Sequence, residues 1–504
     1  MDTLATPKHS VRILLETRPA LDMHAGIPQQ TRLLFRGLSL IPEFSTEGLL
    51  QSSTHALSKG LPASGRTWLG PLPTHKKIDR MARIVIMLEQ RFLRSCASAP
   101  LVTLRRLCGA SEQLTRFDTS QFRDFIWRRL FSKSLPPSDF SVVTQRSFRV
   151  ARTPWTAMHV SALVYRVLGL RLFPRLETQD FDVMIAETPY PATISKNTRL
   201  VIRYHDAIPL LMPHTIAERR HHQAFHYHAL RQNVQSGAWF VCVSEATRRD
   251  LLSIFPQVET RSTTIHNVVS HDYFDEESQV SRAREIIRNR RNQCVAVGRP
   301  SSQTAFFEGV DSEQPLQYLL MVSTIEPRKN HLTLLSAWER LRAESYPSLR
   351  LVLVGSLGWH NRPIVRKLRP WIDRGAVFML EDVPSSELRV LYKHARATIC
   401  PSIAEGFDLS GVEAMRSGGV VIASDIPVHR EIYSDAAEYF NPYCTDTFVR
   451  AIRGVIDPTR SSHREELIRR GARTAARFDC EVIMPKWYAF LTSHITAAQQ
   501  HAAR

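Results

Sequence analysis

Residues 318–456 alternate between short apolar runs and amphipathic stretches, and this alternation constrains the fold more than any other feature. The apolar runs read LLMVS (319–323), RLVLVG (350–355), AVFML (376–380), ATIC (397–400), VVIAS (420–424) and AAEYF (436–440). Each run has the length of a buried strand, and the stretches between the runs have helical periodicity. Parallel strands joined by helices form a doubly wound sheet with right-handed crossovers. The pattern therefore predicts an α/β domain with an open parallel sheet.

The string EGFDLSGVEAM at residues 405–415 places two carboxylates across a strand-to-helix turn. Glu405 follows the ATIC strand, Gly406 opens the turn, and Glu413 lies about two helical turns further on. We expect the two carboxylates to be roughly 10 Å apart. Ligands of open parallel sheets bind beyond the carboxyl ends of the strands. The spacing therefore favours one long ligand that is held at both of its ends.

A pair of cations, Arg328 and Lys329, lies in the turn after the first apolar run, within LLMVSTIEPRKNH (319–331). A helical pattern begins directly after this turn. Backbone amides and the helix dipole favour negative charge at such a position, and two cations add to the effect. The pattern predicts an anion site, and the alternative is a solvated basic turn.

These motifs resemble the nucleotide-binding half of retaining group 1 glycosyltransferases, which are glycogen-synthase-like. That family has the GT-B fold, in which two Rossmann-like doubly wound parallel-sheet domains face each other across a cleft. The resemblance is dense in the C-terminal half and patchy before it, at GIPQQTRLLFRGL (26–38), VIRYHDAIPL (201–210), FVCVSEATRRDLL (240–252) and TIHNV (264–268). IPVHREIY (426–433) and AAEYFNPY (436–443) look most similar to bacterial polysaccharide mannosyltransferases.

The resemblance implies a role for each motif residue in binding a nucleotide-sugar donor. Glu413 would bind the ribose hydroxyls, and Glu405 would lie beside the transferred sugar. Arg328 and Lys329 would bind the diphosphate, assisted by the backbone amides of Phe407, Asp408, Leu409 and Ser410. On the opposite domain His205 would face the donor sugar, and Gly26 would let its loop approach the phosphates. For His205 and the adjacent Asp206, the alternative is a structural pair that stabilises the next turn.

Four positions depart from the family pattern. Asp408 and Ser410 replace a common glycine and proline, which predicts a more acidic sugar pocket. Val268 replaces a glycine of the inter-domain strand. Glu381 replaces a glycine in the turn that meets the nucleotide base. A carboxylate there can accept two parallel hydrogen bonds from guanine but would repel the carbonyl groups of uracil. We therefore expect GDP-mannose rather than a UDP-sugar, the alternative being that Glu381 is exposed and makes no base contact.

The expected chemistry needs no metal ion and no cofactor besides the nucleotide sugar. Fixed positive charge would stabilise the departing diphosphate, and no residue is assigned as a covalent nucleophile. Asp180 and Asp182 form a D-x-D pattern, by which another class of glycosyltransferase binds a metal ion. A hydrolase with paired carboxylates fits less well, because it leaves the two cations unexplained. A sugar phosphorylase, a soluble disaccharide synthase and a non-catalytic basic protein that binds membrane or nucleic acid stay open as rival functions.

The 504 residues, 43% of them hydrophobic, suffice for two domain cores. We expect an N-terminal acceptor-side domain at 1–275, a linker or insertion at 276–316, and the nucleotide-sugar domain at 317–458. Helices at 459–504 would cross back to the N-terminal domain, as in the family.

Positive charge is concentrated between residues 76 and 175, which hold 19 Lys and Arg against 6 Asp and Glu, a net +13 of the total +18. Apolar and aromatic residues lie among the arginines, so we expect a basic helical insertion. Such a region favours an anionic membrane surface, where a glycan or polyprenyl-linked acceptor would be presented. The alternatives are ordinary core-facing helices and nucleic acid, and for nucleic acid no accompanying motif is present.

The seven cysteines show no C-x-x-C pair, and no apolar run is long enough to span a bilayer. We expect a cytoplasmic protein, peripheral on the inner face of the membrane.

Overall fold

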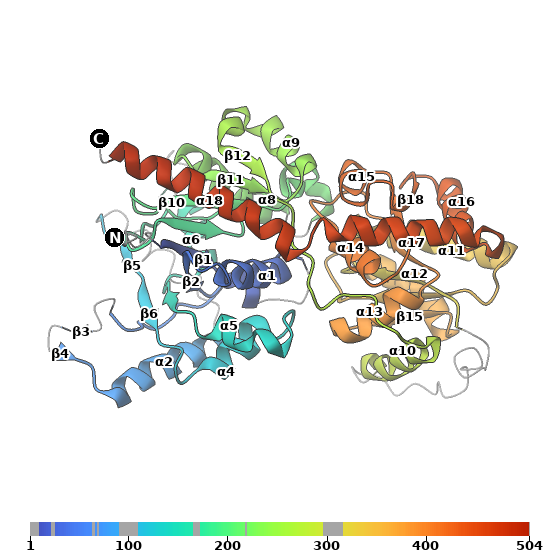
Figure 1. The fold of residues 1–504 in the computed structure, drawn as a ribbon, viewed down its shortest axis with the longest axis horizontal. Coiled ribbons are helices and arrows are strands. Elements are labelled where there is room, and N and C mark those ends of the chain that lie inside the picture. Colours follow the sequence, from blue (N-terminus) through green and yellow to red (C-terminus); the bar gives the residue numbers. More distant parts are fainter. Residues whose placement is uncertain are drawn as a thin grey trace, which may run out of the picture.

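A computed structural model of the chain describes residues 10–21, 26–62, 66–67, 70–89, 109–164, 172–216, 219–295 and 316–502. Two domains lie side by side, each with helices around a mainly parallel sheet (Figure 1). Two clusters of buried apolar residues surround the first sheet. A separate cluster lies against the second sheet.

The N-terminal domain is built on an eight-stranded sheet of order β12-β11-β10-β9-β1-β2-β7-β6. All neighbours are parallel except β6 and β7. The strands are β1 (Val11–Glu16), β2 (Phe44–Leu50), β6 (Thr115–Phe117), β7 (Phe148–Val150), β9 (Val183–Ala186), β10 (Arg199–Tyr204), β11 (Trp239–Cys242) and β12 (Ser262–Thr264). Short pairs outside this sheet are β3 (Arg66–Thr67) with β4 (Gly70–Pro71) and β5 (Glu112–Gln113) with β8 (Leu176–Glu177).

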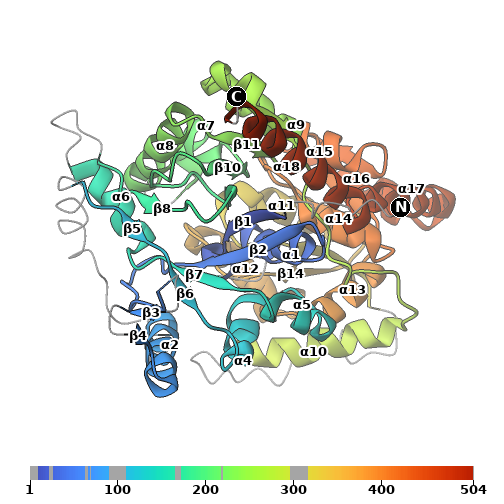
Figure 2. The same cartoon turned by 60° about the vertical axis from the view of Figure 1, so that its left-hand side comes forward.

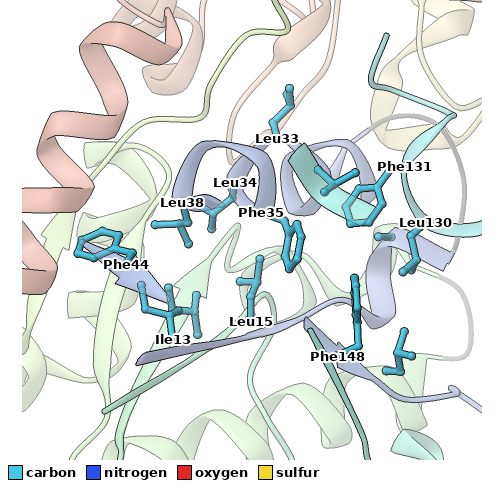
Figure 3. Close-up of a cluster of buried hydrophobic side chains, with 14 of the residues drawn as sticks. Ile13, Leu15, Leu33, Leu34, Phe35, Leu38, Phe44, Leu130, Phe131 and Phe148 are labelled. Atoms are coloured by element: carbon cyan, nitrogen blue, oxygen red, sulfur yellow. The ribbon is translucent and has the colours of Figure 1, made fainter. Parts of the chain in front are cut away.

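The helices of this domain are short except for α1, α2 and α8. They are η1 (Arg18–Leu21), α1 (Ile27–Ser39), α2 (Thr74–Glu89), α4 (Arg123–Ile126), η3 (Trp127–Phe131), η4 (Pro137–Asp139), α5 (Phe140–Thr144), α6 (Trp155–Val164), α7 (Ile208–Leu211), η6 (Pro213–Thr215), α8 (Arg219–Gln235), α9 (Glu245–Ile254) and η7 (Pro256–Arg261). Helix α1 packs on the sheet through Phe35, whose ring centroid lies 5.2 Å from Phe131 and 5.6 Å from Phe148 (Figure 3). This aromatic contact fixes α1, and thereby its N-terminus, relative to the strand ends.

The C-terminal domain has a six-stranded sheet of order β15-β14-β13-β16-β17-β18, with every neighbouring pair parallel. Its strands are β13 (Tyr318–Val322), β14 (Arg350–Val354), β15 (Val377–Leu380), β16 (Ala397–Cys400), β17 (Val421–Ser424) and β18 (Ala437–Phe440). They coincide with the six predicted apolar runs. Both faces of the sheet are covered by helices, which is why the strands are almost continuously apolar.

The helices of the C-terminal part alternate with these strands. They are α10 (Val280–Val295), η8 (Pro327–Lys329), α11 (His331–Glu344), α12 (Arg362–Asp373), α13 (Ser385–His394), α14 (Leu409–Arg416), α15 (Pro427–Tyr433), α16 (Thr445–Ile456), η9 (Pro458–Arg460), α17 (Ser461–Ala476) and α18 (Cys480–Ala502). In Figure 1, α17 lies on the C-terminal domain and α18 runs along the N-terminal domain. Met484, Trp487 and Leu491 of α18 belong to the same buried cluster as Phe35.

Two predicted segments contain structure that was not expected. The basic region at 76–175, predicted as a helical insertion within the N-terminal domain, also supplies β6 and β7 to the main sheet of that domain. The expected linker at 276–316 contains α10, which packs on the C-terminal domain through Ala283, Ile286 and Ile287. Arg290 of α10 forms a two-pronged ion pair with Glu387 at 2.6 and 2.8 Å. Residues 296–315 lie outside the described part of the chain.

Within the described residues, no helix has the length and apolar character that crossing a membrane would require.

Candidate functional site

The predicted site residues of the C-terminal domain meet where its strand order reverses. Strands β13 and β16 are neighbours, although the chain leaves β13 toward β14 and leaves β16 toward β17. Arg328 and Lys329 lie in the loop after β13, and Glu405 lies in the loop after β16. The N–H of Ile403 donates to the carbonyl of Arg328 at 3.0 Å, which joins the two loops. Such a switch point is the usual ligand site of an open parallel sheet.

Glu405 binds both predicted cations. Its carboxylate accepts hydrogen bonds from Arg328 Nη1 at 2.7 Å and from Lys329 Nζ at 2.5 Å. Arg328 also donates from Nη2 to Glu326 at 2.7 Å and from Nη1 to the carbonyl of Ala404 at 2.6 Å. The side chains of Glu405 and Arg328 are only 7% and 14% exposed. The cations are therefore held in place by two carboxylates before any ligand is bound.

The charges of this cluster shift each other's protonation. Burial raises the pKa of Glu405, but the charges of Arg328 and Lys329 outweigh burial and hold that pKa below its usual value. Burial raises the pKa of Glu326, which sits deeper. Arg328, Lys329, Glu326 and Glu405 together carry no net formal charge. Arg328 and Lys329, predicted to form an anion site, are thus paired with carboxylates in this structure.

The N-terminus of α14 is capped by Asp408. The Asp408 carboxylate accepts from the N–H of Ser410 at 3.1 Å and from its hydroxyl at 2.7 Å, and His429 Nε2 lies 3.3 Å away. Burial raises the pKa of Asp408, but the His429 contact and the other charges and donors bring it far below its usual value. Asp408 is buried, and its charge acts to raise the pKa of both Glu405 and Glu413.

Of the amides predicted to bind the diphosphate, that of Ser410 is already used by this cap. Phe407 packs edge-on against Phe478 with ring centroids 5.4 Å apart, so its side chain is part of the core. Leu409 is buried at the first position of α14. The structure thus brings Phe407, Asp408, Leu409 and Ser410 to the turn as predicted, but chiefly as the elements that shape it.

Glu413 lies on α14 and faces the N-terminal domain. Its carboxylate accepts from Gln29 Nε2 at 2.9 Å and from the hydroxyl of Tyr392 at 3.1 Å. Gln29 is in the first turn of α1, immediately after Gly26, which has a left-handed φ of 73°. The Gly26 loop therefore approaches the C-terminal domain beside Glu413. Burial raises the pKa of Glu413 to about 7, although the hydrogen bonds from Gln29 and Tyr392 lower it.

We expect the Glu413→Gln variant to be more stable than the wild type at high pH. When the pKa of a carboxyl group is raised in the folded state, the free energy of unfolding falls as pH rises. Here it falls between the unfolded pKa of 4.5 and the folded value of about 7. The variant should match the wild type near pH 4 and exceed it by up to about 3 kcal/mol at pH 8. Urea unfolding at both pH values measures this. A gain that is equal at pH 4 and pH 8 would contradict the assigned protonation.

The N-terminal domain contributes His205, at the carboxyl end of β10. His205 Nε2 lies 3.0 Å from Glu187 Oε2, and Glu187 follows β9. A carboxylate can only accept, so Nε2 carries the proton and Nδ1 is left for a ligand. Glu187 is fully buried, and its own N–H donates to Glu16 Oε2 at 3.0 Å. His205 is therefore a fixed group rather than a solvated one.

Glu187 is a positioning residue that the sequence analysis missed. We expect Glu187→Gln to lower kcat about 10- to 100-fold with little change in the donor KM, because the ring of His205 loses its charged partner. Asp182→Asn is the matched control, since Asp182 precedes the same strand and therefore lies at its amino end, away from His205. Steady-state kinetics of both variants test this. Equal kcat values for the two variants would show that Glu187 is merely structural.

The two domains touch where His205 meets the Glu405 loop. A Cβ atom added at Gly406 would lie 1.7 Å from the carbonyl oxygen of His205, so only glycine fits there. The hydroxyl of Ser244, at the N-cap of α9, donates to the Gly406 carbonyl at 2.8 Å. His205 and the loop that carries Glu405 thus lie directly against each other at the contact between the domains.

Two further contacts hold the two domains together, in addition to the contact between Gly406 and His205. Glu431 of α15 accepts from the first amides of α9, those of Glu245 at 2.7 Å and Ala246 at 2.9 Å, and from His266 Nε2 at 2.9 Å. Trp359 donates its indole N–H to the carbonyl of Thr215 at 2.8 Å. A negative charge at a helix N-terminus is favourable, so Glu431 stabilises this arrangement of the domains.

The remaining predicted residues lie apart from the cluster. Glu381 and Asp382 are exposed in the turn after β15, as the expected base contact and its alternative would both allow. Asp182 pairs with Arg12 at 3.3 Å and Asp180 with Arg149 at 3.2 Å. Asp182 and Arg12 adjoin the starts of β9 and β1, the edge opposite to His205. In the described ranges, no group of three or more His, Cys, Asp or Glu could hold a metal ion.

Comparison with known proteins agrees with this geometry. Residues 302–474 match the family model of glycosyl transferases group 1. The C-terminal domain belongs to this family. The match contains the whole charged cluster of this glycosyl transferase domain, from Glu326 to Glu413.

Curated relatives of the chain include bacterial mannosyltransferases. The chain is 36% identical over 135 residues to the serotype-specific mannosyltransferase WbdA of Escherichia coli, covering 26% of this chain and 16% of that protein. It is 27% identical over 253 residues to the O-antigen chain mannosyltransferase B of Escherichia coli, covering 50% of this chain and 60% of that protein. The chain thus spans less than two thirds of the length of these curated relatives.

The fold of both domains is GT-B. The structure of sucrose-phosphate synthase from Thermosynechococcus elongatus aligns with a TM-score of 0.56 and 14% identity, covering 97% of this chain and 100% of that one. This likeness confirms the predicted fold class.

Proposed function

We propose that this protein is a retaining, metal-independent glycosyltransferase that moves a hexose, mannose from GDP-mannose, to a glycan or lipid-linked acceptor in surface polysaccharide biosynthesis. The observation that carries the proposal is the Arg328–Lys329–Glu405 cluster at the switch point, facing His205 across the domain contact. The mannosyltransferase relatives of this chain support the choice of sugar.

In the proposed reaction, the donor diphosphate takes the place of Glu405 as the partner of Arg328 and Lys329. Both cations then stabilise charge that grows as the leaving group departs, and one preorganised donor of this kind contributes about 3–4 kcal/mol to lowering the barrier. Glu405, released from the cations, accepts hydrogen bonds from hydroxyls of the transferred sugar. His205 faces the same sugar with Nδ1, and the departing phosphate accepts the proton of the acceptor hydroxyl.

The nucleotide would lie between Glu413 and the turn after β15. Glu413 already accepts two hydrogen bonds, from Gln29 and Tyr392, and the ribose hydroxyls are donors of the same kind. Glu381 and Asp382 are exposed at the end of β15, so they are accessible to a guanine base. Charge-assisted hydrogen bonds of about 1.5–3 kcal/mol each would favour guanine over uracil.

Calorimetric titration with GDP, UDP and ADP tests the nucleotide proposal. We expect GDP to bind at least about 10-fold more tightly than UDP to the wild type. The preference should disappear in the variant that combines Glu381→Ala with Asp382→Ala. A wild-type preference for UDP, or a GDP preference that survives the double substitution, would refute the base contact. Titrations repeated in excess chelator should give the same affinities if no metal ion takes part.

The proposed location is the cytoplasmic side of the membrane, with peripheral attachment through the basic face of the N-terminal domain. Lys76, Lys77 and Arg83 are on α2, where Ile78 and Ile86 are 43% and 52% exposed. Such a mixture of basic and apolar side chains favours an anionic lipid surface.

A further inference from the structure

A cavity of about 400 Å³ lies on the N-terminal domain and is lined by strongly basic side chains. We call it the β7 cavity, because Arg152 and Thr153 on its wall follow the end of β7. The other charged residues of the lining are Lys59, Arg80, Glu112 and Arg175. None of them belongs to the Glu405 cluster or to its surroundings.

The cations of the β7 cavity are not neutralised by ion pairs. In the part of the chain that the structure describes, the side chain of Arg80 donates only to the carbonyl of Gly60 at 3.4 Å, and the side chain of Arg152 only to that of Leu57 at 3.3 Å. Lys59 and Arg175 are exposed. The single carboxylate, Glu112, is tied to the backbone N–H groups of Arg152 at 2.5 Å and Thr153 at 3.2 Å. The lining thus carries four positive charges against one negative charge.

The cavity lies at the carboxyl ends of the strands, as His205 does. Strand β7 is parallel to β2 and reaches β10 through β2, β1 and β9. Four strand spacings correspond to about 19 Å between the two positions. The carbonyl of Thr153 also accepts from Gln51 Nε2 at 2.8 Å, which connects the cavity wall to the end of β2. A ligand in the cavity is therefore displaced sideways from the reacting centre but lies on the same face.

Helix α2 joins the cavity to the basic surface described above. Arg80 projects from α2 into the lining, and Ile78 and Ile86 of the same helix are exposed. The helix is at the periphery of the N-terminal domain in both views (Figures 1 and 2). An anionic group in the cavity would thus be bound next to a surface suited to lipid.

We propose that the β7 cavity binds a diphosphate group. A concave site with a net charge of +3 is suited to a compact polyanion, and guanidinium groups match its oxygens in geometry. If the proposed function holds, this group is the diphosphate that joins the glycan acceptor to its lipid, and several sugar residues span the distance to His205. The two ends of the acceptor would then be recognised separately.

Titration with inorganic pyrophosphate tests the site while the cleft is saturated with the tightest-binding nucleoside diphosphate. The wild type should bind one further pyrophosphate, and Lys59→Ala combined with Arg175→Ala should weaken this binding at least about 10-fold. Both side chains are exposed, so the variant should remain folded. The control, Arg366→Ala with Lys367→Ala on α12, also removes two exposed cations and should bind as the wild type does. Equal binding by all three proteins, or no further binding by the wild type, would overturn the proposal.

Two more measurements are needed. One distinguishes a lipid-linked diphosphate from a soluble one, and the other distinguishes failure of the cavity proposal from failure of the proposed function. Phosphatidylcholine vesicles that contain polyprenyl diphosphate should bind the wild type and the control but not the Lys59 and Arg175 variant. If soluble pyrophosphate binds but these vesicles do not, the ligand is a soluble diphosphate. Equal loss of binding to phosphatidylglycerol vesicles would instead indicate general membrane attraction and refute a specific site. Donor hydrolysis should be unchanged in all three proteins, and its absence from the wild type would refute the function without touching the cavity.

Discussion

Arg328→Ala will lower the free energy of unfolding by about 3–5 kcal/mol and will remove measurable turnover. Arg328 bridges Glu326 and Glu405, whose side chains are only 3% and 7% exposed. Removing this cation leaves two buried carboxylates facing each other with Lys329 as the remaining cation of the cluster, and breaking a buried pair in this way is strongly destabilising.

Lys329 offers the cleaner test of chemistry, because it contacts Glu405 while Glu405 keeps Arg328 as a partner. We expect Lys329→Met to lower turnover at least about 100-fold while the free energy of unfolding falls by about 1–2 kcal/mol at most. Urea denaturation and donor consumption, measured on the same preparations, separate the two effects. Near-normal turnover in Lys329→Met would show that the cluster has only a structural role.

Gly406→Ala will lower turnover about 100-fold, although neither domain core is altered. The added Cβ would lie 1.7 Å from the carbonyl oxygen of His205, whereas real contacts of this kind essentially never fall below 3.0 Å. The Gly406 loop and His205 must therefore move apart by more than 1 Å, and a misplacement of this size can lower the rate by about two orders of magnitude. Turnover and small-angle scattering, which reports the separation of the domains, check this expectation.

Gly454→Ala is the matched control for that substitution. Gly454 lies in α16, where an added Cβ meets only Arg460 Nη1 at 3.6 Å. Alanine is the better helix former, so this variant should gain about 0.5–1 kcal/mol and keep its activity. If both alanine variants retain full turnover, the tight contact between Gly406 and His205 is not required.

The parallel sheet of the C-terminal domain could be predicted because its signal is local. Each strand is a continuous apolar run, and the loops with Arg328 and Glu405 follow two of these runs directly. The sheet order then brings the two loops together, which needs only the usual handedness of crossovers. The position of the charged cluster was therefore accessible from the sequence.

The partners of the site residues were not accessible in the same way. Gln29 and Glu413 are 384 positions apart, and nothing local to either residue indicates their hydrogen bond. Glu187 ends an apolar strand, where a carboxylate looks like an ordinary solvated residue, yet it is fully buried beside His205. Asp408 resembled an acidic group of the pocket, but a helix N-cap uses the same side chain internally. These roles depend on tertiary contacts that residue patterns do not encode.

Incubation of the purified protein with GDP-mannose, UDP-glucose and UDP-N-acetylglucosamine in excess chelator tests the central claim most directly. Even without an acceptor, water can replace the acceptor hydroxyl, so the nucleoside diphosphate should appear slowly. We predict release of GDP from GDP-mannose, with loss of release in Lys329→Met. No nucleotide release from any of the three donors, or release that requires an added metal ion, would contradict the account.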